Sequence, residues 1–266
     1  MKYPLVSIVI ATYNRSKVIE ASIKSVLAQD YPNKEIIIVN DGSTDDTAAI
    51  LSKYPNIHVI TNKQNLRLQK SLNIGCRAAK GKYVARLDDH DLWIDKEKLV
   101  KQIAFMENNP EYGLVGTAFQ IGNRTIINPQ TDQSIRKQML FRCPFCHYTV
   151  IFRKDLYEKV GGYDESLSYS EDWDLWMKMG VLTRMQNLGN VTTVGAEEVG
   201  SLTDRFYIKQ FAINQNILKK YSNEYPNRHV AKIYHFGVGV FFRTFTKGSR
   251  MHQIMTQIYT WCFGRG

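Results

Sequence analysis

An acidic step follows a short apolar run in the first third of the chain. Leu87 is followed by Asp88, Asp89, His90 and Asp91, so three carboxylates and one imidazole lie within four residues. Adjacent carboxylates repel one another, and a divalent cation relieves that repulsion. Mg²⁺ and Mn²⁺ take oxygen ligands and often share them with substrate phosphates. The same residues also suit a turn that caps the next helix, so the step alone leaves both interpretations open.

Polar residues follow two other apolar runs in the same way, namely Thr12, Tyr13 and Asn14 after residues 6–10, and Asp41 after residues 35–39. In an open parallel sheet, ligands bind beyond the carboxyl ends of the strands. We therefore expect the three polar clusters to face one crevice. This convergence favours a ligand site over a plain acidic turn.

The elements that must position these clusters alternate between strand and helix patterns. We predict strands at 6–10, 35–39, 57–60, 82–87 and 114–117, with helices at 18–27, 47–51, 66–79 and 96–108. Near-continuous apolar strands between amphipathic helices are typical of a parallel sheet covered on both faces. After residue 118 the pattern predicts a hairpin at 119–127, a strand at 148–152 and a helix at 155–159. The fold class is thus α/β, with a mostly parallel central sheet and helices on both faces.

The positive charge is concentrated at the C-terminal end. Residues 205–266 hold ten Lys and Arg against the single acidic residue Glu224, which gives about +9 of the net +10, and thirteen aromatic residues. We predict a catalytic domain at 1–204 and a basic, aromatic helical subdomain at 205–266. Such a segment suits an anionic membrane surface. The alternative is a subdomain that buries its aromatic residues and solvates its lysines. Nucleic acid is not expected as a partner, because no known nucleic-acid-binding module is present.

Targeting signals are not evident in the sequence. The apolar stretch 5–11 is too short for a signal peptide core or a membrane span, and no later stretch approaches 18 uninterrupted apolar residues. We therefore expect a cytoplasmic protein with reduced cysteines. A peripheral position on the inner face of the cell membrane is left open.

Four ordered motifs, at 6–14, 39–47, 87–91 and 161–176, carry a family resemblance. The sequence resembles the family 2 glycosyltransferases over roughly residues 4–204. This resemblance implies a GT-A fold, a nucleotide-sugar donor and inversion at the transferred sugar carbon. The chain has no Gly-rich dinucleotide motif and no P-loop motif, which argues against a dehydrogenase or a kinase.

The resemblance also implies a donor site, made by Thr12, Tyr13 and Asn14 beside the nucleoside, Asp41 at the base, and Arg86, Asp88 and Asp89 near the diphosphate. Uracil suits Asp41, because its ring N–H needs an acceptor. A guanidinium suits a diphosphate. We therefore expect a UDP-sugar donor.

The metal position departs from the family pattern. Members usually show Asp-x-Asp, and the third position, which commonly binds the cation, is His90 here. A neutral imidazole ligates Mn²⁺ more readily than Mg²⁺. Alternatively, Asp89 and Asp91 form an Asp-x-Asp shifted by one residue. A divalent cation, Mn²⁺ or Mg²⁺, is expected, with Asp89, His90 and Asp91 as candidate ligands.

An inverting transfer needs a base that takes the proton of the acceptor hydroxyl. The resemblance places this base at Glu171 and Asp172, and Asp172 is the favoured residue because neighbouring carboxylates raise its pKa. The alternative is that this pair only caps the helix that follows. His147 and Trp173 are expected on the acceptor side. The spacing of Cys143 and Cys146 also fits a redox or metal site, but lining of the acceptor site is favoured.

Together these features predict transfer of a sugar to a hydroxyl of a cell-surface glycan or a lipid-linked oligosaccharide. Two departures weaken the pattern: Arg67 stands where the family often has glycine, and residues 195–201 lack a basic residue for the diphosphate. The alternative function is a catalytically inactive nucleotide-sugar-binding or scaffold protein, with His90 as the mark of a damaged metal site.

Overall fold

The computed structural model describes residues 3–196 and 202–244. Its elements follow in the order β1 (Val6–Thr12), α1 (Ile19–Leu27), β2 (Lys34–Asn40), α2 (Thr47–Leu51), β3 (His58–Thr61), α3 (Leu68–Ala78), β4 (Tyr83–Arg86), β5 (Leu92–Trp93), α4 (Lys98–Asn108), β6 (Tyr112–Ile121), β7 (Arg124–Ile126), α5 (Asp132–Gln138), the 3₁₀ turn η1 (His147–Thr149), β8 (Ile151–Arg153), α6 (Lys154–Lys159), α7 (Glu171–Leu182), β9 (Arg184–Gly195), α8 (Leu202–Tyr221) and α9 (Arg228–Thr244).

A single central sheet connects these strands in the order β3-β2-β1-β4-β8-β6-β9-β5, with β7 paired to β6. The first four strands are parallel, as predicted. The other half is mixed: β8 runs antiparallel to β4 and β6, whereas β9 runs parallel to β6. Antiparallel neighbours need no crossover helix, and the strand–helix alternation stops in the sequence at this point.

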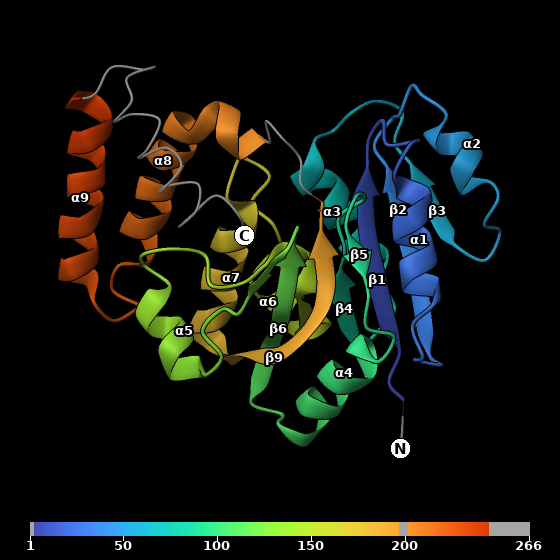
Figure 1. Ribbon diagram of the computed structural model, residues 1–266, viewed down its shortest axis with the longest axis horizontal. Helices are drawn as coiled ribbons and strands as arrows, with labels where there is room; N and C mark the ends of the chain where they lie inside the picture. The colour runs from blue at the N-terminus through green and yellow to red at the C-terminus, as the bar shows by residue number, and fades with distance from the viewer. Residues whose placement is uncertain (1–2, 197–201, 245–266) are drawn as a thin grey trace.

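Helices cover both faces of the sheet (Figure 1). All seven residues of β1 are buried, so its side chains point alternately into two separate cores. Val9 packs with α3 and α7 on one face, and Ile8 and Ile10 pack with α1 and α4 on the other. Burial on both faces is the physical reason why the strand sequence is continuously apolar.

The C-terminal helices α8 and α9 pack beside α7, at the far end of the molecule from α2 (Figure 1). Buried residues of both helices and of the segment between them belong to the same hydrophobic core as β8 and α7, namely Ile217, Leu218, Tyr221, Tyr225 and Ala231. Asp174 of α7 accepts hydrogen bonds from Lys220 and from the Tyr221 hydroxyl, at 3.1 and 3.0 Å. The predicted helical character is confirmed over 202–244, while the domain boundary at residue 204 stays a prediction.

Four elements differ from the sequence-based expectation, and one of them is the two-residue strand β5, which was not predicted. The predicted strand at 148–152 divides into η1 and the shorter β8, since the Thr149 hydroxyl bonds back to the Cys146 carbonyl and tightens the chain. The long strand β9 and the helix α5 were not predicted. The register of β9 against β6 is broken by irregularities, and its exposed Gly189 and Asn190 interrupt the apolar pattern. No helix in the described ranges is long and apolar enough to span a bilayer.

Candidate functional site

The three polar clusters lie at one edge of the sheet. Strands β2, β1 and β4 are parallel neighbours, and Thr12 at the end of β1 pairs with Asn40 at the end of β2. The backbone N–H of Asp41 donates to the Thr12 carbonyl at 2.8 Å, so the chains leave the sheet together. The convergence predicted from the sequence is therefore present.

Asp41 is buried and held from two directions. Its Oδ1 accepts hydrogen bonds from the Asn62 side chain and from the backbone N–H of Leu66, both at 2.8 Å. Asn62 directly follows β3, and Leu66 precedes α3. Both bonds end on one carboxylate oxygen, so Oδ2 is the oxygen available to an incoming donor.

The loop after β1 is locked to the loop after β2. Asn14 has a left-handed backbone (φ 53°), its N–H donates to the Ser43 hydroxyl at 3.0 Å, and its side-chain oxygen accepts from the Thr44 N–H at 2.8 Å. Thr12 is buried below this loop, while the ring of Tyr13 is 43% exposed. Asn14 thus shapes the loop, and Tyr13 and Asn14 are both exposed at the surface while Thr12 is not.

Arg86 is fully buried at the end of β4, directly behind the acidic step. Its guanidinium donates to Asp88 Oδ1 at 2.8 Å, to the Val9 carbonyl at 2.9 Å and to His147 Nε2 at 3.3 Å. The guanidinium of Arg86 therefore makes its hydrogen bonds to acceptors of the protein itself. The structure therefore shows Arg86 orienting Asp88, and its predicted contact with the diphosphate stays a prediction.

His147 is buried between Arg86 and the acidic step. Because Nε2 accepts from Arg86, the ring proton lies on Nδ1, which faces Asp88 Oδ2 at 3.8 Å. The Tyr163 hydroxyl lies 3.2 Å from Nε2. Burial and the charge of Arg86 lower the pKa of His147 to about 4. His147 is thus a neutral side chain that links η1 to the site.

The acidic step itself forms a network of charges. His90 Nδ1 lies 3.0 Å from Asp89 Oδ1, and its Nε2 lies 3.9 Å from Asp91 Oδ1. Asp89 also faces Arg15 at 3.5 Å, and Asp91 Oδ1 accepts from the Ala196 N–H at 2.9 Å. Burial, followed by the charge of Asp88, raises the pKa of Asp91 to about 7. Burial opposes protonation of His90, but the bond to Asp89 and the charge of Asp91 outweigh it and raise the His90 pKa to about 9.

The chemistry of this step fits a divalent cation. Three carboxylates and an imidazole stand on consecutive positions, and Asp91 is almost fully buried next to like charges that a cation would compensate. In the part of the chain that the structure describes, no three His, Cys, Asp or Glu side chains converge as a ready ligand set. The choice of ligands therefore stays open among the predicted Asp89, His90 and Asp91.

The second carboxylate cluster begins helix α7. Ser170 adopts a left-handed conformation (φ 58°), and Glu171 and Asp172 follow it in the first helical turn. Glu171 is buried and accepts a hydrogen bond from Gln69 of α3 at 3.3 Å. Asp172 is half-buried, and its Oδ1 accepts from the Trp173 N–H at 2.7 Å.

Burial, and in addition the negative charge of the acidic step, raises the pKa of both carboxyl groups of the pair. Burial and then the charge of Glu171 raise the pKa of Asp172 to about 7, and Asp88 adds to the same shift. Asp172 can therefore exchange a proton near neutral pH. A carboxylate with this property, placed against a donor site, can act as a general base.

The acceptor-side residues have different positions. Trp173 is buried, and its indole N–H donates to the Met139 carbonyl at 3.0 Å, so it packs the core below the site. Cys143 and Cys146 are free thiols, and burial raises the pKa of both well above the ordinary value. Such thiols are poor redox groups and poor thiolate ligands. The buried thiols thus argue against a redox or metal site, and lining of the acceptor site by this segment stays a prediction.

Several residues of the site escaped the sequence analysis, namely Asn62, Gln69 and Tyr163. Gln69 lies on the buried face of α3, where an apolar residue is usual, and this was the available signal. Asn62 follows a predicted strand, as the other polar clusters do. The role of Tyr163 depends on a contact with His147 that local patterns do not encode.

Comparisons with known proteins agree with this site. Residues 7–161 match the model of the glycosyl transferase family 2. An uncharacterized glycosyltransferase of Haemophilus influenzae is 33% identical, over 69% of this chain and 62% of its own length. The Escherichia coli protein WfaP, named a UDP-Glc:alpha-D-GlcNAc-diphosphoundecaprenol beta-1,3-glucosyltransferase, is 31% identical, over 87% of this chain and 92% of its own length. The chain thus spans less than two thirds of the Haemophilus relative.

Two solved structures share the fold. S. aureus TarS in complex with UDP-GlcNAc has a TM-score of 0.65 and 23% identity, over 82% of this chain and 72% of its own. The mannosyltransferase PcManGT of Pyrobaculum calidifontis, in complex with GDP-Man and Mn²⁺, has a TM-score of 0.66 and 17% identity, over 98% of this chain and 81% of its own. The sheet and its structural neighbours show the GT-A fold, and the family match covers more than half of the chain. This chain therefore has the GT-A fold and belongs to the family 2 glycosyltransferases.

Proposed function

We propose that this protein transfers a sugar, with inversion, from a UDP-sugar to a hydroxyl of a cell-surface glycan or a lipid-linked oligosaccharide. One observation carries the proposal: Asp172 at the start of α7 is within electrostatic range of Asp88 in the acidic step after β4, and the Asp172 pKa is raised to about 7. This arrangement supplies a base next to a place for a nucleoside diphosphate. The E. coli relative, whose name gives a UDP-sugar donor and a lipid diphosphate acceptor, supports the substrate classes.

The proposed mechanism assigns each group a separate task. Asp41 Oδ2 accepts the ring N–H of uracil, and the exposed ring of Tyr13 covers the base. Asp172 takes the proton of the acceptor hydroxyl as that oxygen attacks the sugar carbon from the side opposite the departing UDP. Glu171, fixed by Gln69, keeps the Asp172 pKa high enough for this transfer.

A divalent cation at Asp89, His90 and Asp91 would neutralise the diphosphate as it departs. Arg86 supports this function from behind, because its bond to Asp88 sets the position of the acidic step. His147 completes the support as a neutral partner of Arg86. The presence of Mn²⁺ in the PcManGT complex is consistent with such a cation.

The direct test is an assay of the purified protein with Mn²⁺ and a panel of UDP- and GDP-sugars, with a lipid-linked saccharide as acceptor. We expect release of UDP together with a glycosylated product whose new linkage has the inverted anomeric configuration by NMR. Tight UDP binding without transfer or donor hydrolysis across the panel would favour the alternative, a catalytically inactive binding protein. Activity with GDP-sugars alone would contradict the proposed recognition of uracil.

The substitution D41N tests base recognition. The asparagine oxygen still accepts from Asn62 and Leu66, so the loop should keep its shape. The amide nitrogen cannot accept the uracil N–H, so the affinity for UDP should fall about tenfold to hundredfold. Calorimetric titration measures this change. UDP methylated at uracil N3 serves as the matched control, because it lacks the N–H and should bind both proteins equally weakly.

The substitution H90D tests the metal position. An added carboxylate suits Mg²⁺ better than an imidazole does, so Mg²⁺-supported transfer should rise relative to Mn²⁺-supported transfer. Initial rates at saturating concentrations of each cation measure the ratio. H58D, at an exposed position on β3, is the control and should leave the ratio unchanged. Loss of activity with both cations would show that His90 has another role.

A further inference from the structure

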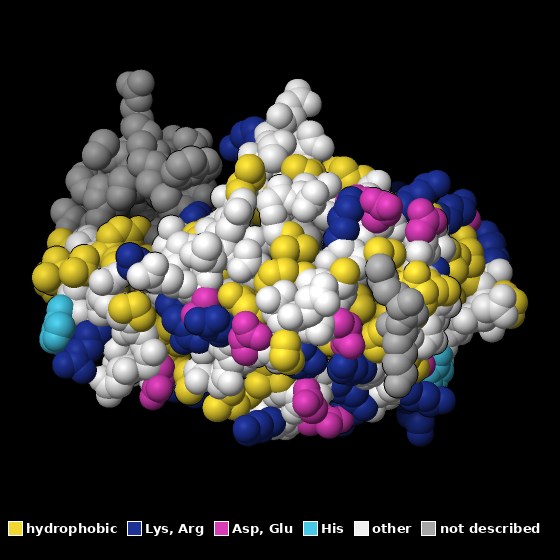
Figure 2. Space-filling model, turned by 90° about the horizontal axis from the view of Figure 1, so that it is seen from below, with side chains coloured by type: hydrophobic (Ala, Val, Ile, Leu, Met, Phe, Trp, Pro, Cys, Tyr) yellow, Lys and Arg dark blue, Asp and Glu magenta, His cyan; other side chains and the backbone are white. Residues whose placement is uncertain are grey.

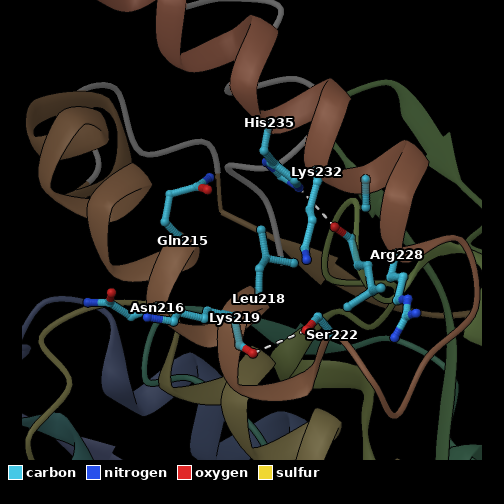
Figure 3. Close-up of a pocket in the computed structure, with 10 residues that line it drawn as sticks. Gln215, Asn216, Leu218, Lys219, Ser222, Arg228, Lys232 and His235 are labelled. Carbon is cyan, nitrogen blue, oxygen red and sulfur yellow. Dashed lines mark hydrogen bonds between the residues drawn. The ribbon is translucent and has the colours of Figure 1, made fainter.

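A pocket of about 320 Å³ lies between α8 and α9, away from the sheet edge that carries the proposed active site. Figure 3 shows side chains from both helices around it, and the principal ones are Gln215, Leu218, Lys219, Arg228, Lys232 and His235. Its floor is apolar, since Leu218, Ala231 and Leu140 are buried. Its rim carries three cations. The pocket is therefore an apolar hollow with a positively charged opening.

The cations at the rim are not neutralised within the described part of the chain. Arg228 donates to the side chains of His229 and Asn223, at 3.1 and 2.9 Å, and to no carboxylate in the described ranges. Neither Lys219 nor Lys232 makes an ion pair with any residue in the described ranges, whereas the adjacent Lys220 pairs with Asp174. Three uncompensated cations around one hollow favour an anion.

Two further features favour a phosphate group as that anion. The side-chain nitrogen of Gln215 is buried at the pocket and has no hydrogen-bond partner among the described residues, so a donor is available for an acceptor-rich ligand. Arg228 and Lys232 belong to the first turns of the 17-residue helix α9, where the backbone also favours negative charge. Phosphate combines the required charge with several acceptor oxygens.

An apolar stripe on α9 indicates where such a phosphate comes from. Val230, Ile233, Phe236 and Val240 recur at helical spacing, and their exposed fractions are 60, 73, 73 and 45%. Figure 2 shows hydrophobic side chains gathered at this end of the molecule, next to a histidine and cationic side chains. An exposed apolar stripe beside cations is typical of a helix that lies in a membrane interface.

We propose that the α8–α9 pocket binds the phosphate headgroup of a membrane lipid while the apolar stripe of α9 enters the bilayer interface. The excess of ten Lys and Arg over one Glu in residues 205–266 gives the charge complementarity to an anionic leaflet. This inference rests on the lipid-linked acceptor of the proposed function and is independent of the transfer chemistry. It gives the protein a second ligand site, which holds it where a lipid-linked acceptor resides.

The test compares K219A/K232A with the matched control K53A/K159A, which removes two exposed lysines from α6 and the segment after α2. Binding is measured by flotation on phosphatidylcholine vesicles that contain phosphatidic acid. Each lysine held near an anionic surface strengthens membrane binding, so removal of two should lower the vesicle partition coefficient of K219A/K232A by about 30-fold. The control variant should partition almost as wild type does. Vesicles made equally anionic with oleate, which has no phosphate, should bind wild type more weakly. Equal losses of vesicle binding in both variants would contradict binding of a lipid phosphate in the pocket. They would show that the protein is attracted to the membrane by its general positive charge alone.

A second variant, I233S/F236S, tests the stripe. Both side chains are largely exposed, so the melting temperature should not change while vesicle binding falls. A lower melting temperature would show instead that the stripe packs against other parts of the chain, and it would overturn the membrane role.

Titration with inorganic phosphate in the absence of vesicles separates the two sources of the anion. If the wild-type protein binds free phosphate tightly but does not bind vesicles, the ligand of the pocket is a soluble phosphate compound and the membrane role is wrong. UDP binding, followed in every variant, reports on the transfer site separately.

Discussion

The substitution D172N is expected to lower kcat about 10³-fold while the affinity for UDP stays unchanged. Asparagine has nearly the same shape as aspartate and can still accept from the Trp173 N–H, so helix α7 should begin as before. The asparagine amide, however, cannot take a proton from the acceptor hydroxyl. Steady-state kinetics with a fixed acceptor, together with calorimetric titration of UDP, measure the two quantities.

The matched control for this substitution is D155N at the start of α6. Asp155 Oδ1 accepts from the following backbone N–H at 2.8 Å, which reproduces the capping geometry of Asp172 at a helix outside the site. D155N should leave kcat unchanged. A similar loss in both variants, or a loss of UDP binding in D172N, would show that Asp172 only shapes the helix, as the capping alternative holds.

The pH dependence of transfer gives a second signature of Asp172. The pKa of this carboxyl is raised from 3.8 to about 7, and its deprotonated form is the base. The rate should therefore fall as the pH drops below about 7, by roughly tenfold per unit once the group is mostly protonated. It should level off above that pH. The acidic limb should disappear from the small residual activity of D172N, which measurements of kcat/KM between pH 5 and 9 would show.

The substitution R86M is expected to lower the free energy of unfolding by about 3–5 kcal/mol and to weaken UDP binding. Methionine fills much of the volume but donates no hydrogen bond. The buried Val9 carbonyl, His147 Nε2 and Asp88 Oδ1 each lose the hydrogen bond from Arg86. With Asp88 released, the acidic step loses its fixed position. Urea denaturation gives the stability change, and calorimetry at a temperature where the variant is folded gives the UDP affinity.

A second, partly buried guanidinium separates these two effects. Arg153 of β8 donates to the carbonyls of Tyr112 and Met106 at 3.0 and 2.8 Å, at the opposite end of the strands from the site. R153M should therefore destabilise the fold and leave the UDP affinity of the folded protein unchanged. Equal weakening of UDP binding in R153M and R86M would contradict a specific role for Arg86 and would indicate general loss of structure.

The two stability variants also bear on His147. Burial, followed by the charge of Arg86, lowers the pKa of His147 to about 4. A histidine whose folded pKa is lowered destabilises the fold as the pH falls, because the unfolded chain binds the proton more readily. Removal of the Arg86 charge should raise this pKa toward its usual value. R86M should accordingly lose less additional stability than R153M does between pH 7 and pH 5.

The sequence by itself determined the location of the site. Each polar cluster follows a continuous apolar run, and such runs become parallel strands that are buried on both faces. Parallel strands end at the same edge, so Thr12, Asp41 and the acidic step had to meet there. The start of α7 at Glu171 was also readable, since acidic residues before an apolar helical pattern mark a helix N-terminus.

Only the tertiary structure decided how the side chains are used. The sequence placed Arg86 next to a strand end but could not show that its donors turn inward to Val9 and His147, which are 77 and 61 residues away. The bond from Gln69 to Glu171 spans 102 residues. Local propensity sets the period of an element and its buried face. Contacts of this range depend on how the elements pack and on the rotamers that the packing allows.

The C-terminal region shows the same division. Composition alone indicated a basic, aromatic and helical segment, because charge and helical spacing are local properties of the sequence. It could not separate the aromatic residues that complete the core, such as Tyr221 and Tyr225, from those that face outward, such as Phe236. That difference arises from the angle at which α8 and α9 pack on α7, and packing fixes which face of each helix remains open to a ligand or a surface.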